Sequence, residues 1–154
     1  MYEWQMAVDK VNDSNRGGGN KLRFYRIFKR FYEVENHCIE IMPRAHRAAF
    51  SKFRCGVAPL NIEVGRYTNQ PIELRVCPFC TNITEDEAHV ILKCPAYTNL
   101  RQDMYTYAIN QIPEFLSLSD IDKINVLFSA KSLVKIVAKT CFNILKTRKT
   151  LLYK

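Results

Sequence analysis

No stretch of the chain is apolar for long enough to cross a membrane. A spanning helix needs about 20 apolar residues, and uninterrupted runs of about 18 are missing from the sequence. The first residues, Met1–Met6, contain neither the basic nor the apolar part of a secretory signal. We therefore expect an intracellular protein that is not secreted and has no membrane partner.

The sequence also lacks the residue sets that catalysis requires. A polymerase holds two Mg²⁺ ions with a pair of aspartates on a tight hairpin, and no such pair occurs; the acidic groups at 85–87 and 120–122 fall where helices are expected to start. No Ser-His-Asp set is recognisable. Gly17–Gly19 follow a polar loop instead of a strand, which excludes a dinucleotide-binding fingerprint. We expect no enzymatic activity and no small-molecule substrate.

Cysteine and histidine, in contrast, occur in a metal-ligand pattern. Four residues follow the spacing Cys-x2-Cys-x8-His-x4-Cys, namely Cys77, Cys80, His89 and Cys94. Three thiolates and one imidazole form a closed tetrahedral zinc site, in which the fourth protein ligand leaves no position for a catalytic water. The pattern predicts one structural Zn²⁺. A redox Cys-x-x-Cys pair or ordinary buried cysteines are the alternatives.

The residues around this motif predict a compact module. Thr84 and Glu87 match a capping box, so a short helix would carry His89 one turn in and end before Cys94. The other cysteines and histidines have no ligand spacing, and we expect them to be buried in the core. They are Cys38, Cys55, Cys141, His37 and His46.

The net charge of +8 is unevenly distributed. Residues 1–60 carry +5, residues 61–122 carry −5, and residues 123–154 carry +8 without one acidic residue. Three thiolates around one zinc add further negative charge to the middle segment. Attraction of a polyanion would therefore come from the two flanks, and not from the metal segment.

Apolar periodicity predicts a mainly α fold: a small helical domain with an embedded zinc module and little or no β-hairpin. We divide the chain into an N-terminal helix with a Gly-rich linker (1–20), a basic helical segment (21–70), the zinc module (71–101) and C-terminal helices with a lysine-rich face (102–154). Helices are expected at 2–11, 21–32, 43–54, 96–112, 119–128 and 130–150, with a strand or extended segment at 61–68.

Two of these helices have one-sided basic faces. In 21–32, Phe24, Phe28 and Phe31 share an apolar arc, and five basic residues occur without one acid. In 130–150, five lysines lie opposite an apolar face. A basic face is commonly only a solvated surface, but here no acids are interleaved with it, so phosphate contact is an equal alternative. The candidate nucleic-acid contacts are Lys21, Arg23, Arg26, Lys29, Arg30, Lys131, Lys135, Lys139, Lys146 and Lys149.

Taken in order, these motifs resemble a known family. The chain is similar, over about residues 20–150, to the C-terminal zinc-knuckle (CCHC) region that lies downstream of the reverse transcriptase domain in LINE-type, non-LTR retrotransposon polyproteins. The matching residues are Lys21-Leu22-Arg23-x-Tyr25-Arg26-x-Phe28-Lys29, Phe53-Arg54-Cys55-Gly56, Glu63-x-Gly65-Arg66-Tyr67, Arg75-x-Cys77-x-x-Cys80, Glu85-Asp86-Glu87-x-His89, Cys94-Pro95-x-Tyr97 and Leu100-Arg101.

The resemblance implies that Cys77, Cys80, His89 and Cys94 bind the metal. It also implies an accessory domain that helps a polymerase hold template RNA or target DNA during target-primed reverse transcription, in a cytoplasmic ribonucleoprotein or in the nucleus. The chain would then be a piece of a longer polyprotein, with the upstream polymerase domain as a further partner.

Two functions of different classes follow. A non-specific nucleic-acid-binding domain would contact the phosphates of single-stranded or structured RNA, or of DNA, through its basic flanks, and would stack exposed aromatics on bases. A structural or protein-interaction module would instead dock on a polymerase or another partner, and it predicts an exposed apolar patch near Tyr97 and Leu100. A finger that reads DNA sequence is disfavoured, because acids surround His89 where base-reading helices carry Arg, Asn and Gln.

Overall fold

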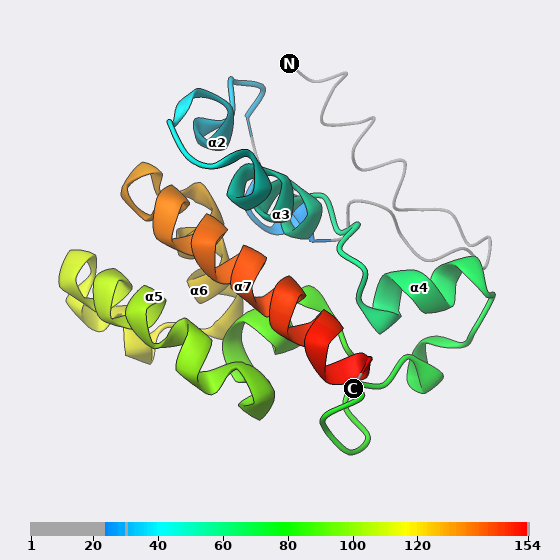
Figure 1. Ribbon diagram of the computed structural model, residues 1–154. Helices are drawn as coiled ribbons and strands as arrows, with labels where there is room; N and C mark the ends of the chain where they lie inside the picture. Colours follow the sequence, from blue (N-terminus) through cyan, green and yellow to red (C-terminus); the bar gives the residue numbers. More distant parts are fainter. Residues whose placement is uncertain (1–23, 30, 154) are drawn as a thin grey trace.

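The structure is a computed structural model that describes residues 24–29 and 31–153. It is mainly helical (Figure 1), and its described residues contain no strand, only an isolated antiparallel bridge between Val76 and Thr84. The predicted fold class is therefore confirmed. No helix among the described residues is both long and apolar enough to span a membrane.

The longest helix, α7 (Val134–Leu152), crosses the face seen in Figure 1 between α3 (Arg44–Arg54) and α5 (Thr98–Gln111). It packs against α3, α5 and α6 (Asp120–Ser129). Its inner face buries Val137, Thr140 and Ile144, as the periodicity predicted, and Leu133 is buried in the turn directly before it. Helix α7 is thus the common packing partner of α3, α5 and α6.

The helix ends follow local sequence signals. Helix α3 begins directly after Pro43 and is followed by Gly56 at φ 66°, a left-handed conformation that glycine adopts without strain. Ser119 caps α6 by accepting a hydrogen bond from the Asp122 amide at 3.2 Å. These predictions are confirmed, as is the helix predicted at 96–112.

One part of the core is a cluster of aromatic rings. Phe128 of α6 stacks on Phe28 at 5.4 Å between ring centroids and meets Phe24 edge-on at 5.1 Å. Phe50 of α3 lies 5.2 Å from the same ring, and each of the four is at most 7% exposed. We call these four residues the aromatic core. Offset and edge-on pairs of this kind stabilise beyond their area burial.

The segment before α3 differs from the prediction. A helix was predicted at 21–32, but the described part holds only the 3₁₀ turn η1 (Tyr25–Ile27), followed by the short helix α2 (Asn36–Ile39). Phe31, placed on the predicted apolar arc, is 64% exposed. The helix predicted at 2–11 lies outside the described residues.

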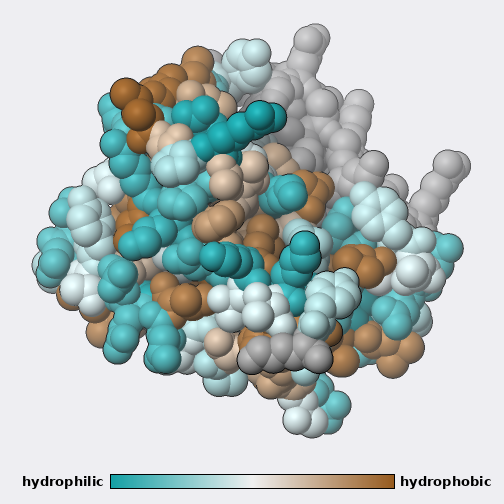
Figure 2. All heavy atoms as spheres, in the orientation of Figure 1, coloured by the Kyte–Doolittle hydropathy of each residue, from teal (hydrophilic) through white to brown (hydrophobic). Residues whose placement is uncertain are grey.

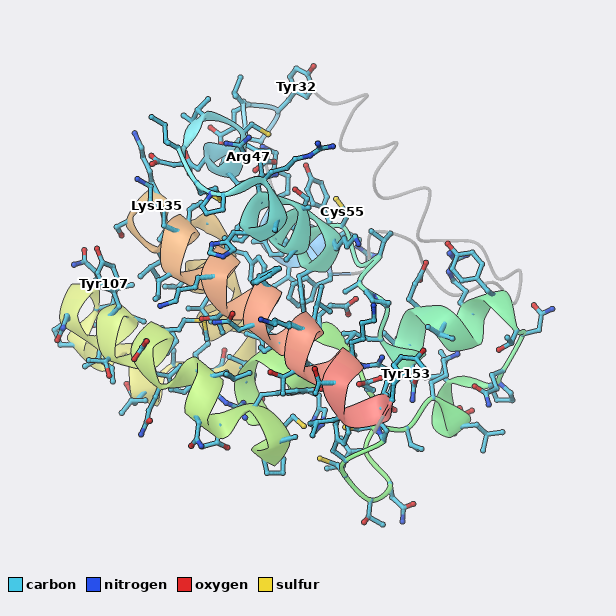
Figure 3. All side chains as sticks on the ribbon, in the orientation of Figure 1. Tyr32, Arg47, Cys55, Tyr107, Lys135 and Tyr153 are labelled. Atoms are coloured by element: carbon cyan, nitrogen blue, oxygen red, sulfur yellow. The ribbon has the colours of Figure 1, made fainter. Side chains whose placement is uncertain are left out.

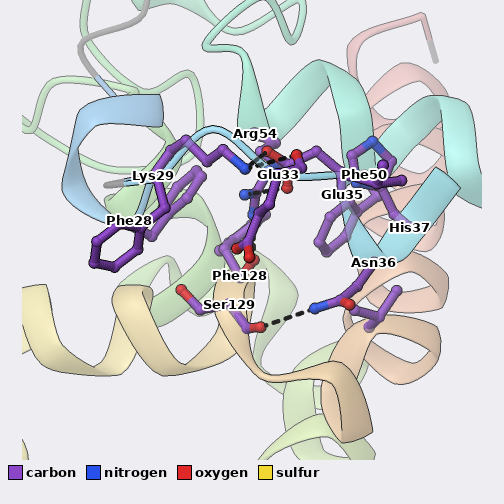
Figure 4. A pocket seen from close by; sticks show the side chains of 13 residues that line it. Phe28, Lys29, Glu33, Glu35, Asn36, His37, Phe50, Arg54, Phe128 and Ser129 are labelled. Atoms are coloured by element: carbon purple, nitrogen blue, oxygen red, sulfur yellow. Dashed lines mark hydrogen bonds and ion pairs between the residues drawn. The ribbon is translucent and has the colours of Figure 1, made fainter. Parts of the chain in front are cut away.

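Buried charge explains why the chain turns away from a helix here. The Lys29 ammonium is buried, donates to the Glu33 carbonyl at 3.1 Å and lies 2.7 Å from the Glu35 carboxylate. Arg54 pairs with the other Glu35 oxygen at 2.5 Å, beside a cavity of about 50 Å³ (Figure 4). Residues 33–35 are extended, and this conformation places the Glu35 carboxylate between Lys29 and Arg54.

A second difference lies at 61–68, where an extended segment was predicted and the structure has helix α4 (Asn61–Tyr67). Glu63 and Arg66, one helical turn apart, form a bidentate ion pair at 2.6 and 3.0 Å. Ile62 and Gly65 face inward. The helical pairing and the buried face outweigh the extended pattern of the local sequence.

Short turns complete the chain between the α-helices, and one of them is a π-helix. They are η2 (Ile72–Leu74), the π-helix η3 (His89–Lys93), η4 (Pro95–Tyr97), η5 (Pro113–Ser117) and η6 (Lys131–Leu133).

The cysteines and histidines outside the zinc motif are buried to different extents. Cys141 is buried in α7 and His37 is packed 5.1 Å from Phe50, both as predicted. His46 is half-buried against Phe142 at 5.0 Å. The prediction is wrong for Cys38, which is exposed because the short α2 turns its thiol outward, and Cys55 is only half-buried.

Candidate metal centre

The first two ligands lie on a tight turn that the backbone closes on itself. The Cys77 amide donates to the Ile83 carbonyl at 2.7 Å, and the Cys80 amide donates to the Cys77 carbonyl at 3.3 Å. Asn82 takes a positive φ of 54°, which Asn tolerates better than most residues. The turn therefore holds Cys77 and Cys80 on one side of a small knuckle.

The other two ligands are joined by the π-helix η3. The Cys94 amide donates to the His89 carbonyl at 2.8 Å, a five-residue step that links the two ligand residues across the turn. The turn is capped by Asp86, whose carboxylate accepts from the His89 amide at 2.7 Å. The predicted capping box is therefore wrong, because Thr84 is engaged in the bridge to Val76.

The four predicted ligands come together. One ligand atom from each of Cys77, Cys80, His89 and Cys94 lies within 4.8 Å of the others. The Cys94 sulfur is 3.8 Å from the Cys77 sulfur and 3.7 Å from the Cys80 sulfur. With Zn–S bonds of about 2.3 Å, the edge of a regular tetrahedron measures about 3.8 Å. The sulfur positions therefore match a tetrahedral zinc.

The imidazole gives an independent test of the fit. Both ring nitrogens of His89 are buried and neither has a hydrogen-bond partner among the described residues. A buried polar nitrogen without a partner is costly, and a metal ion removes that cost. The ligand set and this orphaned ring together fit one structural zinc, held by Cys77, Cys80, His89 and Cys94.

Burial sets the electrostatics of the site. It raises the pKa of Cys94 to about 12 and also raises that of Cys77, whereas it lowers the pKa of His89. Without an ion, burial therefore favours the neutral thiols of Cys77 and Cys94 and the neutral imidazole of His89. The charge of a metal ion reverses this preference for the thiols, because thiolates are its ligands.

A buried arginine completes the surroundings of the sulfurs. The Arg101 guanidinium of α5 donates to the Cys94 carbonyl and is 5% exposed. Its positive charge lies close to a cluster that becomes net negative when three thiolates bind one zinc. Arg101 thus neutralises the site and ties it to α5.

Two further polar contacts attach the zinc module to the rest of the molecule. Glu85, fully buried, pairs bidentately with Arg148 of α7 at 2.7 Å for both bonds, and it also accepts from the Asn61 amide at 2.7 Å. Arg75 donates to the Ile62 carbonyl at 2.9 Å and, through two nitrogens, to the Gln70 carbonyl. The module is bound to α4 and α7 by buried charge.

Sequence reasoning missed these roles. Glu85 was assigned to a helix start and Arg148 was not singled out, because a pair 63 residues apart leaves no local pattern. A signal exists at Gly65: a Cβ built there lies 2.6 Å from the Arg75 Cγ, so only glycine accommodates that side chain. The motifs Glu63-x-Gly65-Arg66-Tyr67 and Arg75-x-Cys77-x-x-Cys80 are thus connected by the contact between Gly65 and the Arg75 side chain.

The candidate nucleic-acid contacts separate into distinct groups. Arg26 is exposed, but Lys29 is buried and paired with Glu35, which removes it as a phosphate contact. The five C-terminal lysines are all exposed, as predicted, although three of them face acids from neighbouring helices: Lys131 and Lys135 face Glu40, and Lys139 faces Asp103. Lys21, Arg23 and Arg30 lie outside the described residues.

Comparison of the chain with protein-family models, curated proteins and solved structures finds no match. The resemblance to the LINE-type zinc knuckle therefore stays a prediction, and the geometry of the residues themselves carries the functional argument.

Proposed function

We propose that this chain is a non-catalytic, zinc-stabilised accessory domain that binds single-stranded or structured nucleic acid, RNA or DNA, as the resemblance to the C-terminal region of a LINE-type reverse transcriptase implies. The observation that carries the proposal is an exposed lysine ridge along α7 and the preceding turn η6, which we define as Lys131, Lys135, Lys139, Lys146 and Lys149. It lies on a rigid helix whose far end is anchored to the zinc module through Arg148.

The C-terminal half of the ridge has the strongest electrostatic claim. Among residues 24–29 and 31–153, no acidic group lies within ion-pair distance of Lys146 or Lys149. Two acids of the neighbouring segments are engaged in ion pairs: Glu85 of the zinc module with Arg148, and Glu63 of α4 with Arg66. The net charge of −5 on residues 61–122 therefore gives too low an estimate of the positive potential that a polyanion meets at this end of the molecule.

A second candidate function, a protein-interaction module, is supported by a different surface. Its predicted patch near Tyr97 and Leu100 is wrong, because Tyr97 is fully buried beside Phe79 and Leu100 is half-buried. Exposed apolar residues instead gather before, within and directly after α2, where hydrophobic side chains are visible in Figure 2. They are Phe31, Tyr32, Val34, Ile39 and Ile41.

Fluorescence anisotropy of a labelled single-stranded RNA with the zinc-loaded protein tests the proposal. We expect micromolar or tighter binding that weakens steeply with salt, because each phosphate contact releases counterions. The double variant Lys146→Glu and Lys149→Glu should weaken binding at least tenfold and reduce the salt slope, since two phosphate contacts are replaced by repulsion.

A matched control reverses two charges elsewhere. Lys52 is exposed on α3 and Lys123 is half-buried on α6, and neither belongs to the ridge. Lys52→Glu with Lys123→Glu changes the net charge equally and should have the smaller effect. Equal losses for the two double variants would mean that only net charge matters. Absence of binding even at low salt would reject the nucleic-acid function and favour the interaction module.

A further inference from the structure

A groove at the N-terminal end of the lysine ridge has the composition of a ligand site. It measures about 520 Å³ and lies between the end of α2, the C-terminal part of α5 and the start of α7. This size falls in the range typical of small-molecule sites. Its lining residues are Glu40, Tyr107, Lys131, Ser132 and Lys135.

Two lysines converge on one carboxylate in this groove. Lys131 and Lys135 are separated by one helical turn, and their ammonium groups lie 3.9 and 3.3 Å from different oxygens of Glu40. Both lysines are more than 60% exposed, whereas Glu40 is 21% exposed. One carboxylate between two ammonium groups leaves the groove with a net positive charge.

The carboxylate is fixed in place by its own backbone. Arg47 of α3 donates to the Glu40 carbonyl at 2.9 Å and to the His37 carbonyl at 3.0 Å, which anchors the end of α2. Glu40 therefore holds the two lysine side chains together on the groove floor. A phosphate group has the same charge sign and more oxygens, so it can join or replace the carboxylate between them.

An aromatic ring also lines the groove. Tyr107, near the end of α5, is 43% exposed, and Figure 3 shows it on the same side of the molecule as Lys135. Its ring is therefore accessible to a ligand in the groove. Exposed rings beside basic groups are the elements with which proteins stack unpaired bases, because every base has an aromatic face.

We infer that this groove binds one nucleotide residue of a single-stranded nucleic acid, with its base against Tyr107 and its phosphate between Lys131 and Lys135. The inference rests on the proposed function and makes it more specific. A duplex would not fit this mode, since its bases are stacked on one another and cannot reach the tyrosine ring.

The test uses the full zinc-loaded chain and a labelled uridine octanucleotide. Tyr107→Leu, which keeps apolar packing but removes the aromatic face, should weaken binding about fivefold or more. Tyr107→Phe should leave affinity unchanged, and Tyr153→Leu, at a tyrosine that is 81% exposed outside the groove, should have little effect. Equal affinity of wild type and Tyr107→Leu would overturn the groove while leaving ridge binding intact.

Removal of the internal carboxylate gives the opposite expectation. Glu40→Gln should tighten octanucleotide binding by up to about fivefold, because the phosphate no longer competes with Glu40 for the lysines. Asp103→Asn is the matched control: it removes one carboxylate beside Lys139, so the net charge changes equally outside the groove. If both variants gained the same affinity, the effect would come from net charge alone, and Glu40 would not be a competitor of the phosphate.

Two probes separate the ligand classes. Uridine monophosphate should shift the amide resonances of residues 107 and 131–135 in an NMR titration, and ribose 5-phosphate should shift them less, because it lacks a base. A polyglutamate peptide of the same charge should compete poorly with the octanucleotide. If polyglutamate competed as well as a nucleic acid of equal charge, the groove would bind anions without base stacking and the inference would be rejected. If the wild-type protein did not bind the octanucleotide at all, the proposed function itself would be rejected.

Discussion

The aromatic core and the zinc module are stabilised in different ways. Around Phe50 and Phe128, four rings contact one another between η1, α3 and α6, and burial of apolar surface is the main contribution. The zinc module also buries apolar side chains, Val90, Ile91 and Tyr97, but charged groups are buried beside them: Arg75, Glu85, Arg101 and Arg148 are each at most 9% exposed. In this region directional polar contacts and the candidate metal ligands are therefore added to apolar burial.

This comparison predicts that the two regions respond differently to metal loss, which is the largest expected effect. Cys80→Ser removes one ligand, and structural zinc contributes on the order of 10 kcal/mol of coupled folding free energy. We expect the segment from about Arg75 to Arg101 to unfold while part of the helix content, held by the aromatic core, persists. Circular dichroism gives the retained helicity, and hydrogen exchange locates the loss.

Cys38→Ser is the control for this variant, because it changes an exposed thiol outside the ligand set. It should leave zinc content and stability unchanged. A single cooperative loss of all helices in Cys80→Ser, or a spectrum that does not change on chelation, would contradict the division into two differently stabilised regions.

The contact between the two regions can be tested at Glu85. Glu85→Ala leaves the Arg148 guanidinium buried without its carboxylate and the Asn61 amide without its acceptor. Breaking a buried pair from one side costs about 3–5 kcal/mol. Urea unfolding monitored by circular dichroism measures the loss, which should be accompanied by faster exchange at the C-terminal end of α7.

The double variant Glu85→Leu with Arg148→Met sharpens this test. It removes both charges and replaces them by apolar groups of similar size, so we expect it to be considerably more stable than Glu85→Ala. If Glu85→Ala and the double variant were equally destabilised, the cost would come from lost packing and not from an unpaired buried charge.

The two regions also differ in how far their sequence predicts their structure. The zinc ligands were predicted from spacing alone, because a metal site needs fixed ligand types at short separations. The α3 and α7 faces followed from apolar periodicity. Helix α4 was missed because it is stabilised by residues outside its own segment. Arg75 donates to the Ile62 carbonyl, and Glu85 accepts from the Asn61 amide.

Long-range charge explains the other errors. Lys29 belongs to a basic run and was predicted to contact a phosphate. In the structure it is buried and paired with Glu35, which also pairs with Arg54. The acids that face the lysine ridge, Glu40 and Asp103, come from α2 and α5, so no pattern within 130–150 indicates them. Pairing between elements distant in sequence has no local signature.

The smallest of the three stability effects is expected where the zinc module meets α4. Gly65→Ala should favour the helix by about 1 kcal/mol through propensity alone. The new Cβ, however, would lie 2.6 Å from Cγ and 2.9 Å from Cδ of Arg75, whose guanidinium is held by the Ile62 and Gln70 carbonyls. Because the side chain cannot withdraw without losing these bonds, we expect a net loss of about 1–3 kcal/mol in urea unfolding.

The identity of the clashing group can be established with a second substitution. In Arg75→Ala the space beside Gly65 is open, so adding Gly65→Ala to that variant should stabilise it, by the helix propensity of alanine. Val64→Ala, at an exposed position of the same helix, reports propensity without the contact. If Gly65→Ala destabilised the protein equally with and without the Arg75 side chain, the close approach would not be the reason for glycine, and the attachment of the zinc module to α4 would rest on Arg75's hydrogen bonds alone.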